Sequence, residues 1–258
     1  MRLYFEDSQT PGPALLLIAG LASDSLSWVM QREVLAQHCR VITCDNRGVG
    51  RSPKPPGPYT VAEMADDIIE GLDGLGISQV SLLGHSLGGA LAQHLAITRP
   101  QRFERLILAC SFSHVEARTL AILESWSDCL ALGAGPELMG KCLFPWLYTE
   151  EFLNRPGMLE GALQAMRLHP YPLDPQGVAG QGGALRQFDS RAQLSQIQIP
   201  TLVLTAARDG LVNPAISRAM AASIAGSQFV QLADTAHACL LETPDVFNEA
   251  VLQFMKKP

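Results

Sequence analysis

Residues 82–91 read LLGHSLGGAL, in which an apolar run leads to a serine between glycines and a helical pattern follows. Gly84, Ser86 and Gly88 fit the pattern G-x-S-x-G, whose typical place is a sharp turn from a buried strand into a helix. Such a turn strains the backbone of the central residue, so its neighbours two positions away must lack a β-carbon. The stretch therefore predicts a serine hydroxyl lifted above the end of a strand.

Short apolar runs alternate with longer amphipathic stretches along the chain. Runs that are apolar on both faces are typical of strands covered by helices from both sides. The sequence therefore predicts an α/β fold with a mostly parallel central sheet flanked by helices. The predicted strands are residues 14–19, 40–44, 79–83, 105–110 and 201–205, with a short leading strand within residues 1–7.

Three helices are predicted, either from the residues that mark their ends or from the apolar residues on one face. Residues 60–75 carry apolar side chains at helical spacing and begin with Thr60 and Glu63 as a capping box. A second helix is expected from Leu87 to Thr98, directly after the serine. The third is a C-terminal helix with apolar residues at Val246, Phe247, Ala250, Val251 and Phe254.

The alternation of strands and helices stops from Val115 to Gln187, where a helical stretch rich in Met, Trp and Leu is interrupted by prolines. An insertion of this size between two strands predicts a helical cap over the strand ends, inserted before the late strands. We expect an α/β core of residues 1–114 and 188–258, and a cap of residues 115–187.

The composition is that of a globular protein: of the 258 residues, 47% are hydrophobic and 17% are charged, and the formal net charge is −6. A mildly acidic chain without a block of Lys and Arg offers no electrostatic footprint for nucleic acid or a membrane surface. Residues 14–22, the longest apolar stretch, are too short to span a bilayer, and no secretion leader is recognised, so we expect a cytoplasmic protein. The six cysteines show no CxxC pair and no ligand-like spacing with histidine, which predicts reduced thiols and no metal site.

A serine hydroxyl becomes a nucleophile only beside a histidine base that is oriented by an acid. After a turn of the kind at Ser86, the acid and then the histidine follow in chain order. Asp209 comes directly after the predicted strand 201–205, and His237 lies on the loop before the C-terminal helix. Each residue alone fits a turn or core position, but their joint order predicts a catalytic triad of Ser86, Asp209 and His237.

The other five histidines are weaker candidates for the base. His85 is expected to point away from Ser86 into packing, and His94 lies inside the following helix. His114 is a reserve candidate just after a strand, and His169 is a loop residue of the cap that could touch substrate. His38 precedes a strand at what should be the opposite edge of the sheet.

Two backbone N–H groups are expected to stabilise the oxyanion: that of Leu87, next to the nucleophile, and that of Leu21, after the predicted strand 14–19. The cap is rich in large apolar residues, most of which should build its own core. Some must line the space above Ser86, and we expect Phe144, Trp146 and Leu147 to contribute to an apolar substrate pocket.

These residues together resemble the α/β-hydrolase superfamily across nearly the whole chain. The resemblance is carried by residues 17–21, 45–52 and 84–89, by Asp209, and by His237 with Glu242, Pro244 and Phe247. In that superfamily the second block is a structural loop, and many members have a histidine where this chain has Ala19. Within it, the chain looks most like small capped carboxylesterases, enol-lactone hydrolases and aminoacrylate hydrolase-like proteins. The last likeness comes from residues 18–21 and 236–239.

The triad and the resemblance imply a serine hydrolase that cleaves a carboxylic ester or lactone of a small-to-medium, mainly apolar substrate through an acyl-enzyme on Ser86. No cofactor is expected, and neither a phosphate loop nor a dinucleotide glycine pattern is present in the sequence. Two alternatives stay open. One is a cofactor-free perhydrolase or carbon–carbon bond hydrolase with the same triad, and the other is a hydrolase-like protein that binds a ligand without turnover. The sequence does not indicate the oligomeric state.

Overall fold

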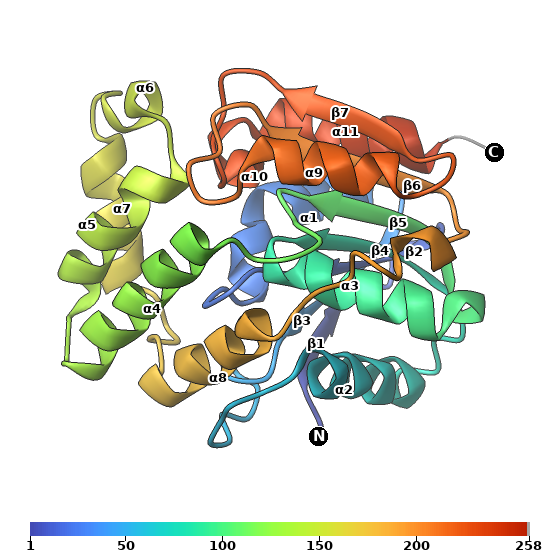
Figure 1. The fold of residues 1–258 in the computed structure, drawn as a ribbon, viewed down its shortest axis with the longest axis horizontal. Helices are drawn as coiled ribbons and strands as arrows, with labels where there is room; N and C mark the ends of the chain where they lie inside the picture. Colours follow the sequence, from blue (N-terminus) through green and yellow to red (C-terminus); the bar gives the residue numbers. More distant parts are fainter. Residues whose placement is uncertain (257–258) are drawn as a thin grey trace.

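The strands that are apolar on both faces form the centre of the fold. The computed structural model describes residues 1–256, and its sheet has seven strands in the order β1-β3-β2-β4-β5-β6-β7 (Figure 1). Only β1 runs antiparallel to its neighbour, and the other neighbouring strands in this described sheet are parallel. The strands are β1 (Tyr4–Asp7), β2 (Ala14–Ile18), β3 (Arg40–Asp45), β4 (Val80–His85), β5 (Phe103–Ala109), β6 (Thr201–Ala206) and β7 (Gln228–Leu232). The predicted α/β class with a mostly parallel sheet is confirmed.

The edge strand β7 was not predicted from the sequence. Two of its five residues, Val230 and Gln231, are exposed, and only Leu232 is fully buried. A strand at the edge of a sheet is covered on fewer sides, so it lacks the continuous apolar run that identifies the central strands. The missed strand matters because the loop that follows it carries His237.

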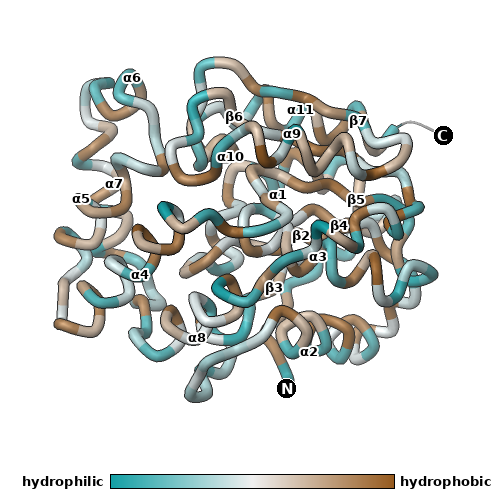
Figure 2. Tube along the Cα trace, viewed as in Figure 1, coloured by the Kyte–Doolittle hydropathy of each residue, from teal (hydrophilic) through white to brown (hydrophobic). Residues whose placement is uncertain are grey.

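Both faces of the sheet are covered by helices, and side chains alternate between two apolar layers. In β2, Leu16 and Ile18 belong to one buried cluster, and Leu15 and Leu17 to the other. The first layer is completed by α2 (Val61–Gly74), α3 (Leu87–Thr98) and α9 (Pro214–Ala222), and the second by α1 (Val29–Ala36) and α11 (Pro244–Met255). Hydrophobic residues accordingly concentrate along the central strands (Figure 2).

The predicted helices are confirmed. Helix α2 begins with the expected capping box, in which Glu63 N–H donates to Thr60 Oγ1 over 3.1 Å and Thr60 N–H donates to Glu63 Oε2 over 2.9 Å. Helix α3 has the predicted bounds, Leu87–Thr98. In α11, Phe247, Val251 and Phe254 are buried, whereas Val246 is exposed.

Five α-helices lie between β5 and β6 in the chain, within the segment for which a cap was predicted. Four of them gather on one side of the molecule, away from most of the sheet, while α8 lies closer to the strands (Figure 1). Their bounds are α4 (Ala117–Ala131), α5 (Pro136–Leu147), α6 (Glu150–Leu153), α7 (Met158–Arg167) and α8 (Pro175–Arg186). We call α4–α8 the inserted helices. Within residues 1–256, no helix has both the length and the apolar character needed to cross a bilayer.

Helix α3 approaches strand β2 so closely that no side chain fits between them at Gly88. A Cβ atom added to this glycine would overlap the carbonyl oxygen of Ile18 and lie 2.8 Å from that of Ala19. Both obstacles are backbone atoms, which cannot move aside without shifting a strand or a helix. Glycine at this position therefore sets the distance between the helix and the sheet.

Gly88→Ala should lower the free energy of unfolding by about 1–3 kcal/mol, because the added methyl group overpacks the contact between α3 and β2. Urea unfolding followed by circular dichroism measures this. Gly74→Ala, at the end of α2, is the matched control, since a Cβ there has nothing within 4 Å. Equal stability of the two variants would contradict the close approach.

Candidate active site

Ser86 has the strained backbone that its sequence context predicts. Its φ of 54° and ψ of −117° lie outside the regions that residues with a side chain usually adopt. Ser86 N–H donates to Ala109 O over 2.9 Å, and its carbonyl accepts from Gly89 N–H at 2.9 Å and Ser111 Oγ at 3.0 Å. The surrounding strand and helix therefore hold this conformation from both sides.

The flanking glycines leave room for the turn. A Cβ atom on Gly84 would overlap the backbone of Gly88, and one on Gly89 would overlap the side chain of Ser111. Ser86 itself is the residue before the first turn of α3, so its hydroxyl lies at the positive end of the helix dipole. The turn thus places a serine where a developing negative charge is stabilised.

Asp209 and His237 are joined by a hydrogen bond. The distance from His237 Nδ1 to Asp209 Oδ2 is 2.8 Å, and both side chains are buried. The other carboxylate oxygen accepts N–H bonds from Leu211 at 2.9 Å and Val212 at 2.8 Å, which fixes the carboxylate plane. An ionised carboxylate only accepts, so the proton of His237 lies on Nδ1 and the lone pair on Nε2.

The sheet brings the three predicted catalytic residues to one edge. Ser86 follows β4, Asp209 follows β6 and His237 follows β7, and these strands run parallel. The carboxyl ends of parallel strands lie at the same edge of the sheet, where α/β proteins bind their ligands. Within residues 1–256 the structure has no hydrogen bond between Ser86 Oγ and His237.

His85 ties the loop of His237 to the serine turn. Its Nε2 donates to the carbonyl of His237 over 2.9 Å, and the centroids of the two rings lie 4.9 Å apart. The ring also packs edge-on against Trp28, as expected for a packing residue. Burial, and then the neighbouring His237, lower the pKa of His85 to about 3, so this imidazole stays neutral. The sequence did not reveal the link to His237, because 152 positions separate the two residues.

The loop after β2 lies against the serine. A Cβ atom on Gly20 would come within 3.3 Å of Ser86 Cβ, so the backbone of this loop passes directly beside the hydroxyl-bearing carbon. Among residues 1–256, no protein oxygen accepts a hydrogen bond from the backbone N–H of Leu21 or of Leu87. Both of the predicted oxyanion donors therefore remain free for a ligand.

Gln181 of α8 anchors this loop, and sequence reasoning missed it. Its Oε1 accepts from Ala22 N–H at 2.9 Å, and its Nε2 donates to Arg47 O over 2.9 Å. Ala22 has a left-handed φ of 59°, which an unanchored alanine rarely adopts. Gln181 is fully buried in a helix rich in glycine. The only hint of this role in the sequence was a long polar side chain among glycines. The sequence could not show which groups it would bind.

Glu242 performs a similar task for the loop before His237. Its carboxylate accepts from Ala236 N–H at 2.9 Å and Thr235 Oγ1 at 3.3 Å. It also accepts from the backbone N–H and the hydroxyl of Thr149, the residue that caps α6. The inserted helices therefore fix both loops that flank Ser86.

The three predicted pocket residues of the inserted helices have different surroundings. Leu147 O accepts from Ala238 N–H over 2.8 Å, beside His237. Trp146 lies close to Gly210, the neighbour of Asp209, since Cε3 of the indole is 3.9 Å from a Cβ built there. Phe144 packs instead against Tyr148, with ring centroids 5.6 Å apart, and is buried. The structure thus brings Trp146 and Leu147 to the triad loops and places Phe144 among the inserted helices.

The remaining histidines lie apart from this arrangement. His94 is part of α3, His38 is exposed before β3, and His114 pairs with Asp189. His169 Nε2 lies 3.5 Å from Asp24 Oδ2, where burial raises the pKa of the aspartate.

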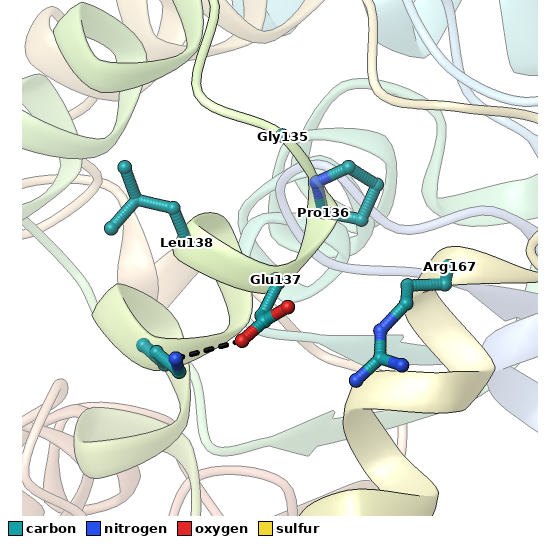
Figure 3. A pocket seen from close by; sticks show the side chains of 6 residues that line it. Gly135, Pro136, Glu137, Leu138 and Arg167 are labelled. Carbon is teal, nitrogen blue, oxygen red and sulfur yellow. Dashed lines mark hydrogen bonds and ion pairs between the residues drawn. The ribbon is translucent and has the colours of Figure 1, made fainter.

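A surface hollow of about 440 Å³ lies between α5 and α7, and it contains none of the predicted site residues (Figure 3). It is lined by Gly135, Pro136, Glu137, Leu138, Lys141 and Arg167, with an ion pair between Glu137 and Lys141. Possible metal ligands occur elsewhere: within residues 1–256, the donor atoms of His85, Cys110 and His237 lie within 4.8 Å of one another.

Comparison with known proteins agrees with this geometry. Residues 13–244 match the sequence profile of a family described as alpha/beta hydrolase fold. A protein of Azorhizobium caulinodans, provisionally named carbamate hydrolase RutD, is 30% identical over 252 residues, covering 98% of this chain and 94% of the relative.

Two solved structures share the fold over nearly their whole length. The enol-lactonase from Burkholderia xenovorans LB400 superposes with a TM-score of 0.89 at 26% identity, covering 99% of this chain and 96% of the other. A thermophilic esterase from Thermogutta terrifontis superposes with a TM-score of 0.87 at 31% identity, covering 98% and 93%.

The neutral imidazole of His85 should make stability depend on pH. Its folded pKa of about 3 lies below the ordinary value of 6.5, so between these values the unfolded chain binds a proton that the folded chain does not. Its contribution therefore falls as pH drops below about 6.5, by up to about 1.4 kcal/mol per pH unit. Urea unfolding of the wild type and of His85→Gln at pH 7, 6 and 5 measures this. As pH falls from 7 to 5, the wild type should lose more stability than His85→Gln. A stability difference that stays constant over this range would refute the lowered pKa of His85.

Proposed function

The chain belongs to the α/β-hydrolase fold family, and from this premise we propose that it is a serine hydrolase that cleaves a carboxylic ester or lactone through an acyl-enzyme on Ser86. The observation that carries the proposal is the buried pair of His237 and Asp209, 2.8 Å apart, on parallel-strand loops beside a strained serine turn. An ordinary core histidine needs neither a fixed carboxylate nor a neighbouring serine in a left-handed conformation.

In the proposed mechanism, Nε2 of His237 takes the proton of Ser86 while the hydroxyl attacks the substrate carbonyl. Asp209 holds Nδ1–H, so it selects the tautomer that can act as base and stabilises the imidazolium that forms. The two N–H bonds from Leu211 and Val212 keep the carboxylate pointed at the ring. The base is therefore oriented before substrate arrives.

The negative charge on the attacked carbonyl oxygen is stabilised by the backbone N–H groups of Leu21 and Leu87. Leu87 begins α3, so its N–H adds the positive end of the helix dipole. The protonated His237 then donates to the leaving alcohol or enol. Water activated by the same histidine releases the acid and restores Ser86. These steps use protein groups and water alone.

The proposed substrate is a small molecule with an acyl group of small to medium size and mainly apolar character. Trp146 and Leu147 lie beside the loops of Asp209 and His237, where they would contact such a group. The names of two relatives, an esterase at 31% identity and an enol-lactonase at 26%, support an ester or lactone bond.

A carbamate is the second candidate substrate class, because a relative at 30% identity over 98% of the chain is provisionally named a carbamate hydrolase. Attack on a carbamate carbonyl would use the same nucleophile, base and oxyanion donors. A carbamate differs from an ester in its leaving group and in how readily its carbonyl carbon is attacked. Parallel assays with matched esters, lactones and carbamates distinguish the two classes, and analysis of the products detects perhydrolysis or carbon–carbon cleavage.

Ser86→Ala should lower kcat for a p-nitrophenyl ester by about 10⁴-fold or more, because serine, histidine and aspartate act as a unit. The assay compares wild type, Ser86→Ala and Ser125→Ala over a series of acyl lengths. Ser125 is exposed on α4, so its variant is the matched control and should keep full activity. Turnover that persists in a folded Ser86→Ala protein would refute the proposed nucleophile.

Gln181→Met should lower kcat by roughly 10- to 100-fold with little change in KM, since the loop that presents Leu21 N–H loses its anchor at Ala22. Affinity for a boronic acid, which mimics the tetrahedral intermediate, should fall in parallel. Gln187→Met, at the exposed end of the same helix, is the control. A rise in KM at unchanged kcat would instead assign Gln181 to substrate binding.

A further inference from the structure

The first turn of α4 binds the loop that carries Asp209. Thr119 Oγ1 donates to Leu211 O over 2.7 Å, and Nη2 of Arg118 donates to Gly210 O over 3.1 Å. The two acceptors are consecutive carbonyl groups directly after Asp209 in the chain, and each lies 92 positions from its donor. Thr119 is buried, whereas Arg118 is exposed. One of the inserted helices is therefore tied to the loop of the proposed triad acid.

Each of these carbonyl groups shares a peptide unit with an N–H group that binds Asp209. Val212 N–H, in the unit of Leu211 O, donates to Asp209 Oδ1 over 2.8 Å. Leu211 N–H, in the unit of Gly210 O, donates to the same oxygen over 2.9 Å. A trans peptide unit is planar, so its C=O and N–H point in opposite directions. Fixing the oxygen of such a unit consequently fixes the direction of its N–H.

The connection from Thr119 to Asp209 is a buried chain of hydrogen bonds. The hydroxyl of Thr119, the peptide unit of Leu211 and Val212, and the carboxylate follow one another in series, and all four residues are buried. Hydrogen bonds in series polarise one another, so donation to Leu211 O strengthens the bond from Val212 N–H to the carboxylate. Water can replace the exposed guanidinium of Arg118, but bulk water does not reach the buried partner of Thr119.

The orientation of the Asp209 carboxylate controls the ring of His237. Oδ2 accepts from Nδ1 of the ring over 2.8 Å, while Oδ1 accepts both backbone N–H bonds. If the carboxylate rotates about its Cβ–Cγ bond, Oδ2 moves out of line with Nδ1, and the ring loses the partner that sets its tautomer and its direction. The two bonds to Oδ1 oppose this rotation. A change at Thr119 therefore reaches His237 through the carboxylate.

We propose that Thr119 is a positioning residue, which orients Asp209 through the peptide unit of Leu211 and Val212. The effect on catalysis rests on the proposed function, because it requires His237 to be the base. The effect on the carboxylate stands on the hydrogen bonds alone. Through Thr119, the first turn of α4 makes the geometry of the proposed triad depend on the inserted helices.

Four substitutions separate positioning from simple support of the fold. Thr119→Val keeps the branched shape and removes the hydroxyl, whereas Thr119→Ser keeps the hydroxyl. Thr10→Val is the matched control, because Thr10 Oγ1 also donates to a backbone carbonyl, that of Cys39, over 2.7 Å. Thr10 lies in the loop before β2, at the opposite edge of the sheet from Ser86. Arg118→Met removes the other donor from an exposed position, so it should fold even if Thr119→Val does not.

The kinetics of ester hydrolysis are the first measurement. Thr119→Val should lower kcat by about 10-fold with little change in KM, because the base is misdirected while contacts with the substrate persist. Thr119→Ser should recover most of the wild-type kcat, Arg118→Met should lower kcat by about two- to threefold, and Thr10→Val should leave it unchanged. Urea unfolding should show a loss of stability in both valine variants. A folded Thr119→Val protein with the wild-type kcat would contradict the proposal.

Proton NMR is the second measurement, and it does not need turnover. A proton held between a histidine nitrogen and a carboxylate resonates at lower field than other N–H protons, because the charged acceptor makes the bond short and strong. Loss of this signal in Asp209→Asn assigns it to Nδ1–H of His237. The signal should move upfield and exchange faster with solvent in Thr119→Val, and to a smaller extent in Arg118→Met. It should keep its position in Thr119→Ser and Thr10→Val.

The two measurements distinguish failure of this proposal from failure of the proposed function. A shifted signal in Thr119→Val, in a protein without Ser86-dependent turnover, would uphold the positioning of Asp209 and reject the proposed function alone. An unmoved signal in Thr119→Val, or in Arg118→Met if only that variant folds, would overturn the positioning role. An equal shift in Thr10→Val would also overturn it, since the effect would then follow from a general loss of stability.

Discussion

The left-handed backbone of Ser86 is the constraint on which the rest of the site depends. A residue at φ 54° and ψ −117° persists only where its surroundings hold it, and here the end of β5 and the first turn of α3 both bind its backbone. A side chain fits at the centre of the turn, at Ser86. None fits two positions before or after it, because Gly84 and Gly88 lie against backbone atoms. The same contact sets the distance from α3 to β2 and leaves the N–H of Leu87 at the helix terminus free.

The inserted helices help to anchor the loops that the sheet places at its carboxyl edge. The sheet supplies the loops after β2, β4, β6 and β7 at its carboxyl edge, but loops without internal structure do not hold a catalytic geometry by themselves. Gln181 of α8 binds the loop after β2, and Glu242 binds both the cap residue of α6 and the loop before His237. Because both anchors are buried, a change in the inserted helices reaches the candidate site through these hydrogen bonds.

Behind the proposed base, the same compact packing has a second consequence. His85 and the pair Cys110–Cys239 fill the space under His237 and hold its loop close to the serine turn. The imidazole of His85 stays neutral there, so it brings no charge that must be solvated. These side chains therefore support the loop of His237 from behind.

The sequence by itself determined the fold class, the central strands, α2 and α3, and it predicted Ser86, Asp209 and His237, which the structure brings to one edge of the sheet. Each of these leaves a local signal: a run apolar on both faces, a capping box, glycines two positions from a serine, or an acid directly after a strand. It missed β7 because an edge strand is only partly covered and keeps polar residues. The pocket of Phe144, Trp146 and Leu147 stays a prediction, because periodicity does not tell which residues of a helix face the site.

Only the tertiary structure decided which distant residues meet. The bonds of Gln181 to Ala22 and of His85 to His237 join positions 159 and 152 residues apart, and Cys110 lies 129 positions from Cys239. Hydrogen bonds depend on distances of a few ångströms, which the packing of the whole sheet and its helices sets and no local pattern records.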